Sequence, residues 1–251
     1  MKDDNFLAGS ILAAALIVAG SLVYVFGPVR PNSPNLEANS LNPIGDSISV
    51  LPPFETVLPY GQAIGKEGEV ILGDPNAPVS IVEYGDYQCP FCGRFFSTIE
   101  DKVRKDYIAS GKAKMVYKDL IIIDSFISGG HESTDAALAV NCAAEGEKFW
   151  EYHDAVFAVE IGDGNKENSG NLTKEMFLNI AEKLGLDRTR FESCYDTRKY
   201  LSKVEADTSE AQKVLPRAST PSTFINGKLL QGAVSYTEFA AAIDEALGVK
   251  K

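Results

Sequence analysis

VSIVEYGDYQCPFC, residues 79–92, joins a short apolar run to two cysteines that are separated by two residues. The first six residues have the length of a strand and are apolar enough to be buried on both faces, which is typical of a central strand. From Cys92 to Tyr107 apolar residues recur at helical spacing, and Gly111 is a candidate helix end. Residues 114–118 then predict a second strand. The stretch therefore predicts a strand–helix–strand unit with the cysteines at the helix entrance.

The position of the cysteine pair suggests redox chemistry. At the start of a helix, unpaired backbone N–H groups and the helix dipole favour a thiolate. We therefore expect Cys89 to be the nucleophile, and Cys92, one turn further, to resolve the mixed disulfide. The alternative is half of a zinc site, which needs two more Cys or His ligands at compact spacing. The remaining cysteines and histidines lie on distant predicted helices, so redox chemistry is favoured.

A long helical stretch occupies roughly residues 131–214. Ser133, Thr173 and Asp187 are candidate N-caps for three of its helices. The polar loop 162–171 lacks the glycine placement of a calcium-binding loop and is interpreted as a plain connection. His131 and His153 are expected to be structural.

Strand signals return after this helical stretch. Residues 222–225 and 228–230 predict two strands, and Asn226-Gly227 is a strong two-residue hairpin turn between them. A closing helix is expected over residues 236–247. The order of elements in the folded part is therefore βαβ, helices, ββα.

The amino-terminal region is predicted to anchor the chain. Residues 6–26 are almost continuously apolar, and as a helix they would span about 31 Å, close to the hydrocarbon thickness of a bilayer. A cleaved signal peptide usually has a shorter apolar region and a small-residue cleavage site, which is missing here. We expect a transmembrane anchor at 1–27, a Pro/Asn/Ser-rich linker at 28–62, and a folded domain at 63–251.

The composition of the chain excludes several classes of function. The 251 residues are 45% hydrophobic and carry a net charge of −11, so a nucleic-acid partner is not expected. Four cysteines are too few for a disulfide-stapled miniprotein. The chain has no P-loop, no complete Gly-x-Gly-x-x-Gly and no His-Glu-x-x-His, so we expect no nucleotide, flavin or metal cofactor.

From about residue 69 to 249 the chain resembles a DsbA-like thiol–disulfide oxidoreductase of the thioredoxin superfamily. The resemblance rests on the Val-Glu-Tyr strand before CPFC, on KFWEYHD at residues 148–154, and on Thr220-Pro221 ahead of the hairpin. It implies an α/β, thioredoxin-like fold with a large helical insertion. It also implies that Pro221 is a cis-proline facing the sulfurs and that Thr220 offers a hydroxyl to substrate. Phe91 stands where DsbA has a histidine that holds the thiolate, which implies a weaker oxidant.

Two further residues are candidates for a supporting role. In relatives, an acidic residue at the position of Glu83 lies beneath the active site and relays protons for the buried thiol, and Lys118 is a candidate partner for it. The alternative is a strand-end glutamate that reaches solvent.

Cys142 and Cys194 are either two inert buried thiols or a second structural disulfide. The even cysteine count and the oxidising compartment that the resemblance implies favour the disulfide.

These features predict a membrane-anchored oxidase that introduces disulfides into unfolded or secreted polypeptides. Charges flanking the anchor give no orientation, so the periplasmic or extracellular placement of the C-terminal domain follows from the chemistry alone. The resemblance implies a quinone-coupled membrane reoxidase of DsbB or VKOR type. The alternatives are a thiol reductase or isomerase, and a tethered, non-catalytic chaperone-like binding module.

Overall fold

The computed structural model describes residues 61–65 and 68–249. Every described residue belongs to one compact unit. The anchor predicted at 1–27 and residues 28–60 of the predicted linker therefore lie outside the described residues. Within the described part, none of the helices combines the length and the apolar character needed to cross a membrane.

A six-stranded sheet in the order β1-β2-β4-β3-β5-β6 organises the domain. β3 and β4 pair in parallel, as a strand–helix–strand unit requires, and all other neighbours pair antiparallel. β1 and β2 are not predicted by the sequence analysis, because three residues are too few to show a strand's alternating pattern. The strands are β1 (Gln62–Ile64), β2 (Val70–Leu72), β3 (Val79–Gly85), β4 (Ala113–Asp119), β5 (Ser222–Ile225) and β6 (Lys228–Gln231).

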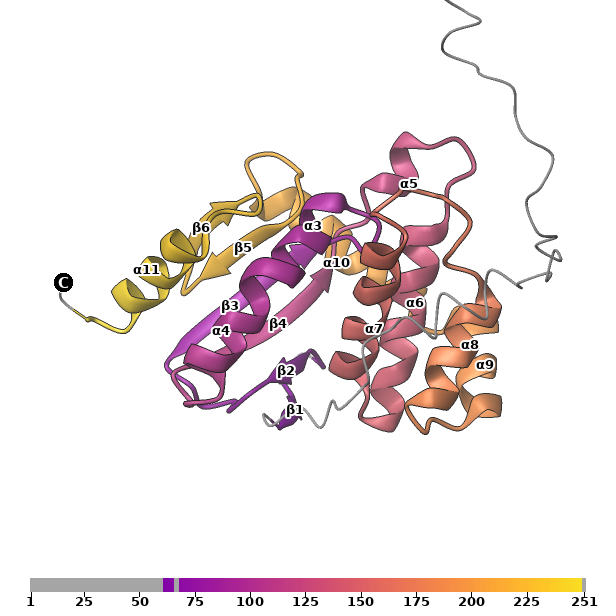
Figure 1. The fold of residues 1–251 in the computed structure, drawn as a ribbon, viewed down its shortest axis with the longest axis horizontal. Helices are drawn as coiled ribbons and strands as arrows, with labels where there is room; N and C mark the ends of the chain where they lie inside the picture. The colour runs from indigo at the N-terminus through magenta and orange to yellow at the C-terminus, as the bar shows by residue number, and fades with distance from the viewer. Residues whose placement is uncertain (1–60, 66–67, 250–251) are drawn as a thin grey trace, which may run out of the picture. The chain divides into compact units, whose positions relative to one another are not determined.

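One long helical segment connects β3 to β4. It comprises α3 (Pro90–Phe95), the π-helical turn η1 (Phe96–Glu100), α4 (Asp101–Val103) and the π-helical turn η2 (Arg104–Ile108). α3 and α4 lie along one face of the sheet (Figure 1). Phe95 of α3 packs against Phe239 of α11 (Tyr236–Ala246), so the closing helix covers the same face.

Most helices of the predicted insertion lie beside the sheet (Figure 1), whereas its last helix packs against β4. The insertion is a helical layer in which buried aromatic side chains, among them Trp150 and Phe157, supply much of the core. Its members are α5 (Ile123–Phe126), α6 (Glu132–Ala143), the 3₁₀ turn η3 (Ala144–Gly146), α7 (Phe149–Gly162), α8 (Lys174–Lys183), α9 (Arg188–Asp196) and α10 (Leu201–Val214).

Two of the three predicted helix caps are confirmed. The side chains of Thr173 and Asp187 accept hydrogen bonds from backbone N–H groups in the first turns of α8 and α9. The prediction for Ser133 is wrong, because the N-cap of α6 is His131 and Ser133 lies in the first turn of the helix. The carboxylate of Asp124 accepts hydrogen bonds from the backbone N–H of Ser133 at 3.0 Å and performs the capping from outside the helix.

The predicted hairpin is confirmed. Asn226 and Gly227 have φ angles of 46° and 87°, as a two-residue turn with both central residues in the left-handed region requires. The turn pairs β5 with β6 and so fixes the strand that follows Pro221.

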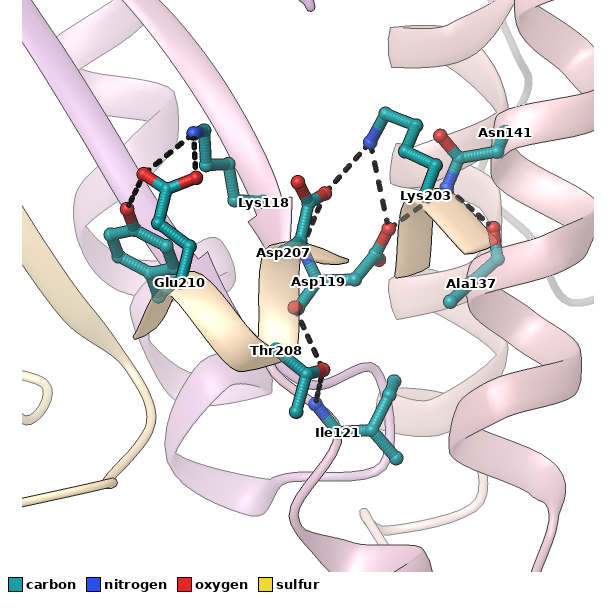
Figure 2. Close-up of polar contacts among 10 residues, drawn as sticks. Lys118, Asp119, Ile121, Ala137, Asn141, Lys203, Asp207, Thr208 and Glu210 are labelled. Carbon is teal, nitrogen blue, oxygen red and sulfur yellow. Dashed lines mark hydrogen bonds and ion pairs between the residues drawn. The ribbon is translucent and has the colours of Figure 1, made fainter. Parts of the chain in front are cut away.

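Polar contacts hold α10 against β4 (Figure 2). Glu210 accepts hydrogen bonds from Nζ of Lys118 at 2.8 and 2.7 Å. Thr208 donates its hydroxyl to the backbone carbonyl of Asp119 at 3.1 Å, and Nζ of Lys203 lies 4.0 Å from the carboxylate of Asp119. Because α10 leads directly into the segment before β5, these contacts help to fix where that segment lies.

Candidate active site

The cysteine pair lies at the start of α3, as predicted. Cys89 is the N-cap residue, Pro90 occupies the first turn, and the backbone N–H of Cys92 donates to the carbonyl of Cys89 at 2.9 Å. Both cysteines are free thiols. Cys89 retains 6% of its surface and Cys92 none, so a reaction partner reaches Cys89 first.

The two thiols have opposite acidities. A hydrogen bond from the Cys92 thiol, together with the backbone N–H groups of Cys92 and Phe91, outweighs partial burial and lowers the pKa of Cys89 to about 7. Burial raises the pKa of Cys92 well above its usual range, and the neighbouring Cys89 sulfur and Glu83 raise it further. At neutral pH Cys89 therefore has substantial thiolate character, while Cys92 keeps its proton.

The segment before β5 lies against the nucleophile. The Thr220–Pro221 peptide bond is cis, which agrees with what the resemblance implies. Sγ of Cys89 lies 3.6 Å from the backbone carbonyl oxygen of Thr220. Thr220 therefore contacts the sulfur through its main chain, and a hydrogen bond to its side chain also helps to lower the pKa of Cys89.

Glu83 is buried within β3, with 1% of its surface exposed. Burial raises the pKa of its carboxyl well above the usual range, nearby Glu100 and Cys89 raise it too, and Arg104 opposes them. Its Oε2 atom has no hydrogen-bond partner in the described part of the chain. The alternative of a glutamate that reaches solvent is therefore excluded, and the carboxyl lies within electrostatic reach of both thiols.

The predicted partnership of Glu83 with Lys118 is wrong. In the β3–β4 register Glu83 lies opposite Tyr117, and Tyr84 lies opposite Lys118. Since successive strand residues point to opposite faces, Lys118 lies on the face of Tyr84, where it pairs with Glu210 (Figure 2). The sequence analysis placed the two residues on neighbouring strands but did not establish their register.

A buried charged cluster behind the cysteine-bearing helix was not predicted. Nη1 of Arg104 lies 2.7 Å from Oδ2 of Asp154, and the same guanidinium binds Glu100. Burial alone would raise the pKa of Glu100, but Arg104 and then His153 lower it to about 2. His153 also lies 3.0 Å from the hydroxyl of Tyr87. The ionised Glu100 is one of the groups that raise the pKa of Glu83, so this cluster influences the site electrostatically.

Glu100, His153 and Asp154 carry potential metal-ligand atoms within 4.8 Å of one another. The Arg104 guanidinium already binds both carboxylates, and a second positive charge would repel it. The arrangement fits a structural ion-pair network better than a metal site. Only the i,i+4 spacing of Glu100 and Arg104 is visible in the sequence; the contact with α7 depends on the fold.

Cys142 and Cys194 form a disulfide that joins α6 to α9 across 52 residues of sequence. The two cysteines are therefore a structural disulfide and not two inert buried thiols. It belongs to the helical insertion, and neither cysteine contributes to the Cys89–Cys92 pair.

Comparisons with known proteins give the family of the chain. The family described as Thioredoxin matches residues 65–245. The chain is 27% identical over 183 residues to disulfide bond formation protein D of Bacillus subtilis (strain 168), covering 72% of this chain and 78% of the relative.

Solved structures with the same fold are also known. The crystal structure of oxidised BdbD from Bacillus subtilis has a TM-score of 0.62 at 27% identity, over 75% of this chain and 97% of BdbD. Wolbachia pipientis alpha-DsbA1 has a TM-score of 0.60 at 24% identity, covering 71% of this chain and 90% of that one, and supports the fold alone.

Proposed function

We propose a specific role for this chain, which belongs to the thioredoxin family and is a DsbA-like thiol–disulfide oxidoreductase. The role is that of an oxidase that forms disulfides in extracytoplasmic polypeptides through Cys89 and Cys92. The observation that carries the thiol–disulfide exchange is the pair of thiols at the entrance of α3, one with a pKa lowered to about 7 and the other buried and protonated. The similarity to a protein named for disulfide bond formation favours the oxidising direction.

The reaction begins from the Cys89–Cys92 disulfide. A substrate thiolate attacks Sγ of Cys89, the Cys89–Cys92 bond breaks, and Cys92 leaves and takes up a proton. A second substrate thiolate then attacks the substrate sulfur of the mixed disulfide, and Cys89 leaves as the thiolate. The substrate has lost two electrons and gained a disulfide, and the enzyme holds both electrons as a dithiol.

The acidity difference between the thiols explains their roles. A low pKa makes Cys89 the better leaving group in the second step and stabilises the reduced enzyme, which makes the disulfide more oxidising. Cys92 must gain or lose a proton in each cycle while it is buried. The raised pKa of Glu83 suits it to exchange that proton, since burial favours the protonated form of the carboxyl.

A substrate would bind to the surface around Cys89. Phe91 exposes 58% of its surface between the two cysteines and offers an apolar contact to an unfolded polypeptide. The main chain of Thr220 and Pro221 lies beside the Cys89 sulfur, where it can align a substrate backbone during exchange.

The proposed function also includes a membrane anchor for the domain and a partner that reoxidises the cysteine pair. The apolar residues 6–26 would anchor the chain, with the folded domain on the periplasmic or extracellular side of the cell membrane. A quinone-coupled membrane protein of DsbB or VKOR type would take two electrons and two protons from the dithiol and restore the disulfide. Both inferences rest on the sequence and on the family to which the chain belongs.

A reductase or isomerase is the second candidate, and a specific observation favours it. Phe91 donates no hydrogen bond, and the pKa of about 7 at Cys89 equals the value typical of thioredoxin, well above the value of about 3.5 in DsbA. The tethered binding module is not retained, because the family assignment indicates an enzyme.

The experiment that tests the proposal uses the full chain in detergent, oxidised at Cys89–Cys92. It is mixed with a reduced two-cysteine peptide, and disulfide formation in the peptide is followed by mass. We expect stoichiometric oxidation, absent in Cys89→Ser. Failure to oxidise the peptide, combined with dithiothreitol-driven reduction of insulin, would identify a reductase.

A further inference from the structure

The loop between α7 and α8 reaches the chain on both sides of the CPFC motif, at Gln88 before it and at Gly93 after it. Asn168 donates its backbone N–H to the side-chain oxygen of Gln88, the residue before Cys89. At the other end, a Cβ atom at Gly93 would lie 2.3 Å from Oδ1 of Asn165. A side chain at position 93 would therefore displace the Asn165 side chain from this end of the motif, and the loop is more than a plain connection.

Two buried carboxyl groups hold the same glutamine. Nε2 of Gln88 donates to Oε2 of Glu132 and to Oε2 of Glu160, each at 3.1 Å. The remaining oxygens bind the loop: Gly170 donates its N–H to Glu132 at 2.8 Å, and Asn171 donates its side-chain amide to Glu160 at 2.7 Å. We call Gln88, Glu132 and Glu160 the clamp.

Both carboxyl groups are held at an energetic cost. Among the described residues, neither forms an ion pair with a lysine or arginine, so hydrogen bonds alone compensate for their burial. Burial raises the pKa of Glu160 to about 8; Asn171 opposes this, while Glu132, Asp163 and Asp86 add to it. In a purely structural core, two apolar side chains would avoid the free-energy cost of burying carboxyl groups. The clamp is therefore better explained by the position in which it holds Gln88 and the loop.

A shift of Gln88 would move the nucleophile directly. Gln88 and Cys89 share a peptide bond, and the turn before them is fixed because Asp86 accepts hydrogen bonds from the N–H groups of both residues, at 2.9 and 3.0 Å. Cys89 is also the N-cap, so its main chain sets where the N–H groups that favour its thiolate point.

We propose that Glu132 and Glu160 are positioning residues for the redox pair. Through Gln88 and the loop 163–171 they hold both ends of the Cys89–Cys92 turn in the geometry that thiol exchange requires. No contact of either carboxyl with a sulfur is involved. The inference rests on the proposed function only in taking Cys89–Cys92 as the redox pair.

The test compares Glu160→Ala with Glu160→Gln in the full chain. Two quantities are measured: the rate of Cys89 alkylation by iodoacetamide as a function of pH, and the rate of peptide oxidation. We expect Glu160→Ala to slow peptide oxidation about tenfold and to displace the alkylation midpoint, since small misplacements of reacting groups can cost up to ~100-fold. Glu160→Gln keeps the size and one acceptor oxygen, so it can keep one of the two hydrogen bonds and is expected to lie between Glu160→Ala and the wild type.

Glu145→Ala is the matched control. Glu145 lies on the same insertion, pairs with Lys199 at 2.6 Å and makes no contact with the clamp. It is expected to change stability towards urea without changing the alkylation profile. If Glu160→Ala behaves in the same way, with a normal profile and a normal oxidation rate, Glu160 is merely structural and the proposal is wrong.

A second pair of variants tests the loop if Glu160→Ala does not fold. Gly93→Ala is expected to slow oxidation because its methyl group displaces Asn165, and Gly93→Ala/Asn165→Gly is expected to restore it. Equal rates in both variants would contradict the loop contact. If the wild type itself fails to oxidise peptide, the proposed function is wrong, whereas the alkylation profiles still decide about the clamp.

Discussion

Sγ of Cys89 and the carbonyl oxygen of Thr220 lie 3.6 Å apart although 131 positions separate the two residues. The sheet creates this proximity. β3 leads into Cys89, and β5, which begins directly after Pro221, pairs with β3 so that Tyr84 lies opposite Ser222. Cys89 thus lies shortly after the end of β3, and Thr220–Pro221 lies directly before the neighbouring strand β5, although the helical insertion separates them in sequence.

Removing the Cys92 thiol should raise the pKa of Cys89. The hydrogen bond from Cys92 is the largest cause of the lowered value of about 7, so Cys92→Ala is expected to move the alkylation midpoint of Cys89 upwards, towards the ordinary thiol value. Cys92→Ser keeps a donor and should keep most of the shift. Identical midpoints for the two variants would show that this hydrogen bond is not the cause.

Glu83→Gln should slow thiol exchange while the domain stays folded. Because the pKa of Glu83 is raised in the folded state, the native protein binds a proton that the unfolded chain has lost, and stability falls as pH rises above the unfolded pKa. Glutamine does not ionise, so Glu83→Gln does not lose stability in this way as pH rises. The variant should therefore unfold at the same urea concentration as the wild type, or at a higher one, at pH 7. Exchange kinetics that match the wild type across pH 6–8 would rule out the proton-relay role.

Arg104→Met should destabilise the domain by about 3–5 kcal/mol, because Glu100 and Asp154 would remain buried without their shared cation. Lys105→Met is the control. Lys105 forms an exposed ion pair with Asp101, and such a pair stabilises the fold by less than about 1 kcal/mol. Urea unfolding of both variants measures the difference, and similar losses would mean that the buried cluster contributes no more than a surface pair.

Replacing both Cys142 and Cys194 by alanine should lower the free energy of unfolding by about 4 kcal/mol, since the disulfide closes a 52-residue loop. The bridge lies in the insertion, so the pH profile of Cys89 alkylation should not change. A changed profile would instead indicate that the insertion transmits strain to the redox pair.

The sequence predicts those parts of the site that local patterns encode. The placement of CPFC between an apolar strand and a helix, the Asn226-Gly227 turn and the caps at Thr173 and Asp187 all depend on short-range chemistry and are confirmed. What it misses depends on register and tertiary contact.

The assignment of Lys118 to Glu83 fails by one residue of register, which reverses the face of the sheet. The clamp joins Gln88 to carboxyl groups 44 and 72 positions away, and no periodic pattern marks such a contact.

The reduction potential of the Cys89–Cys92 pair tests the central claim most directly. The full chain is equilibrated in graded glutathione buffers, and the oxidised fraction is read by alkylation and mass. An oxidase with a moderately lowered Cys89 pKa should have a potential between about −270 mV, the value for thioredoxin, and about −120 mV, the value for DsbA. A potential at or below about −270 mV would contradict the account, because such a pair delivers electrons to its substrates.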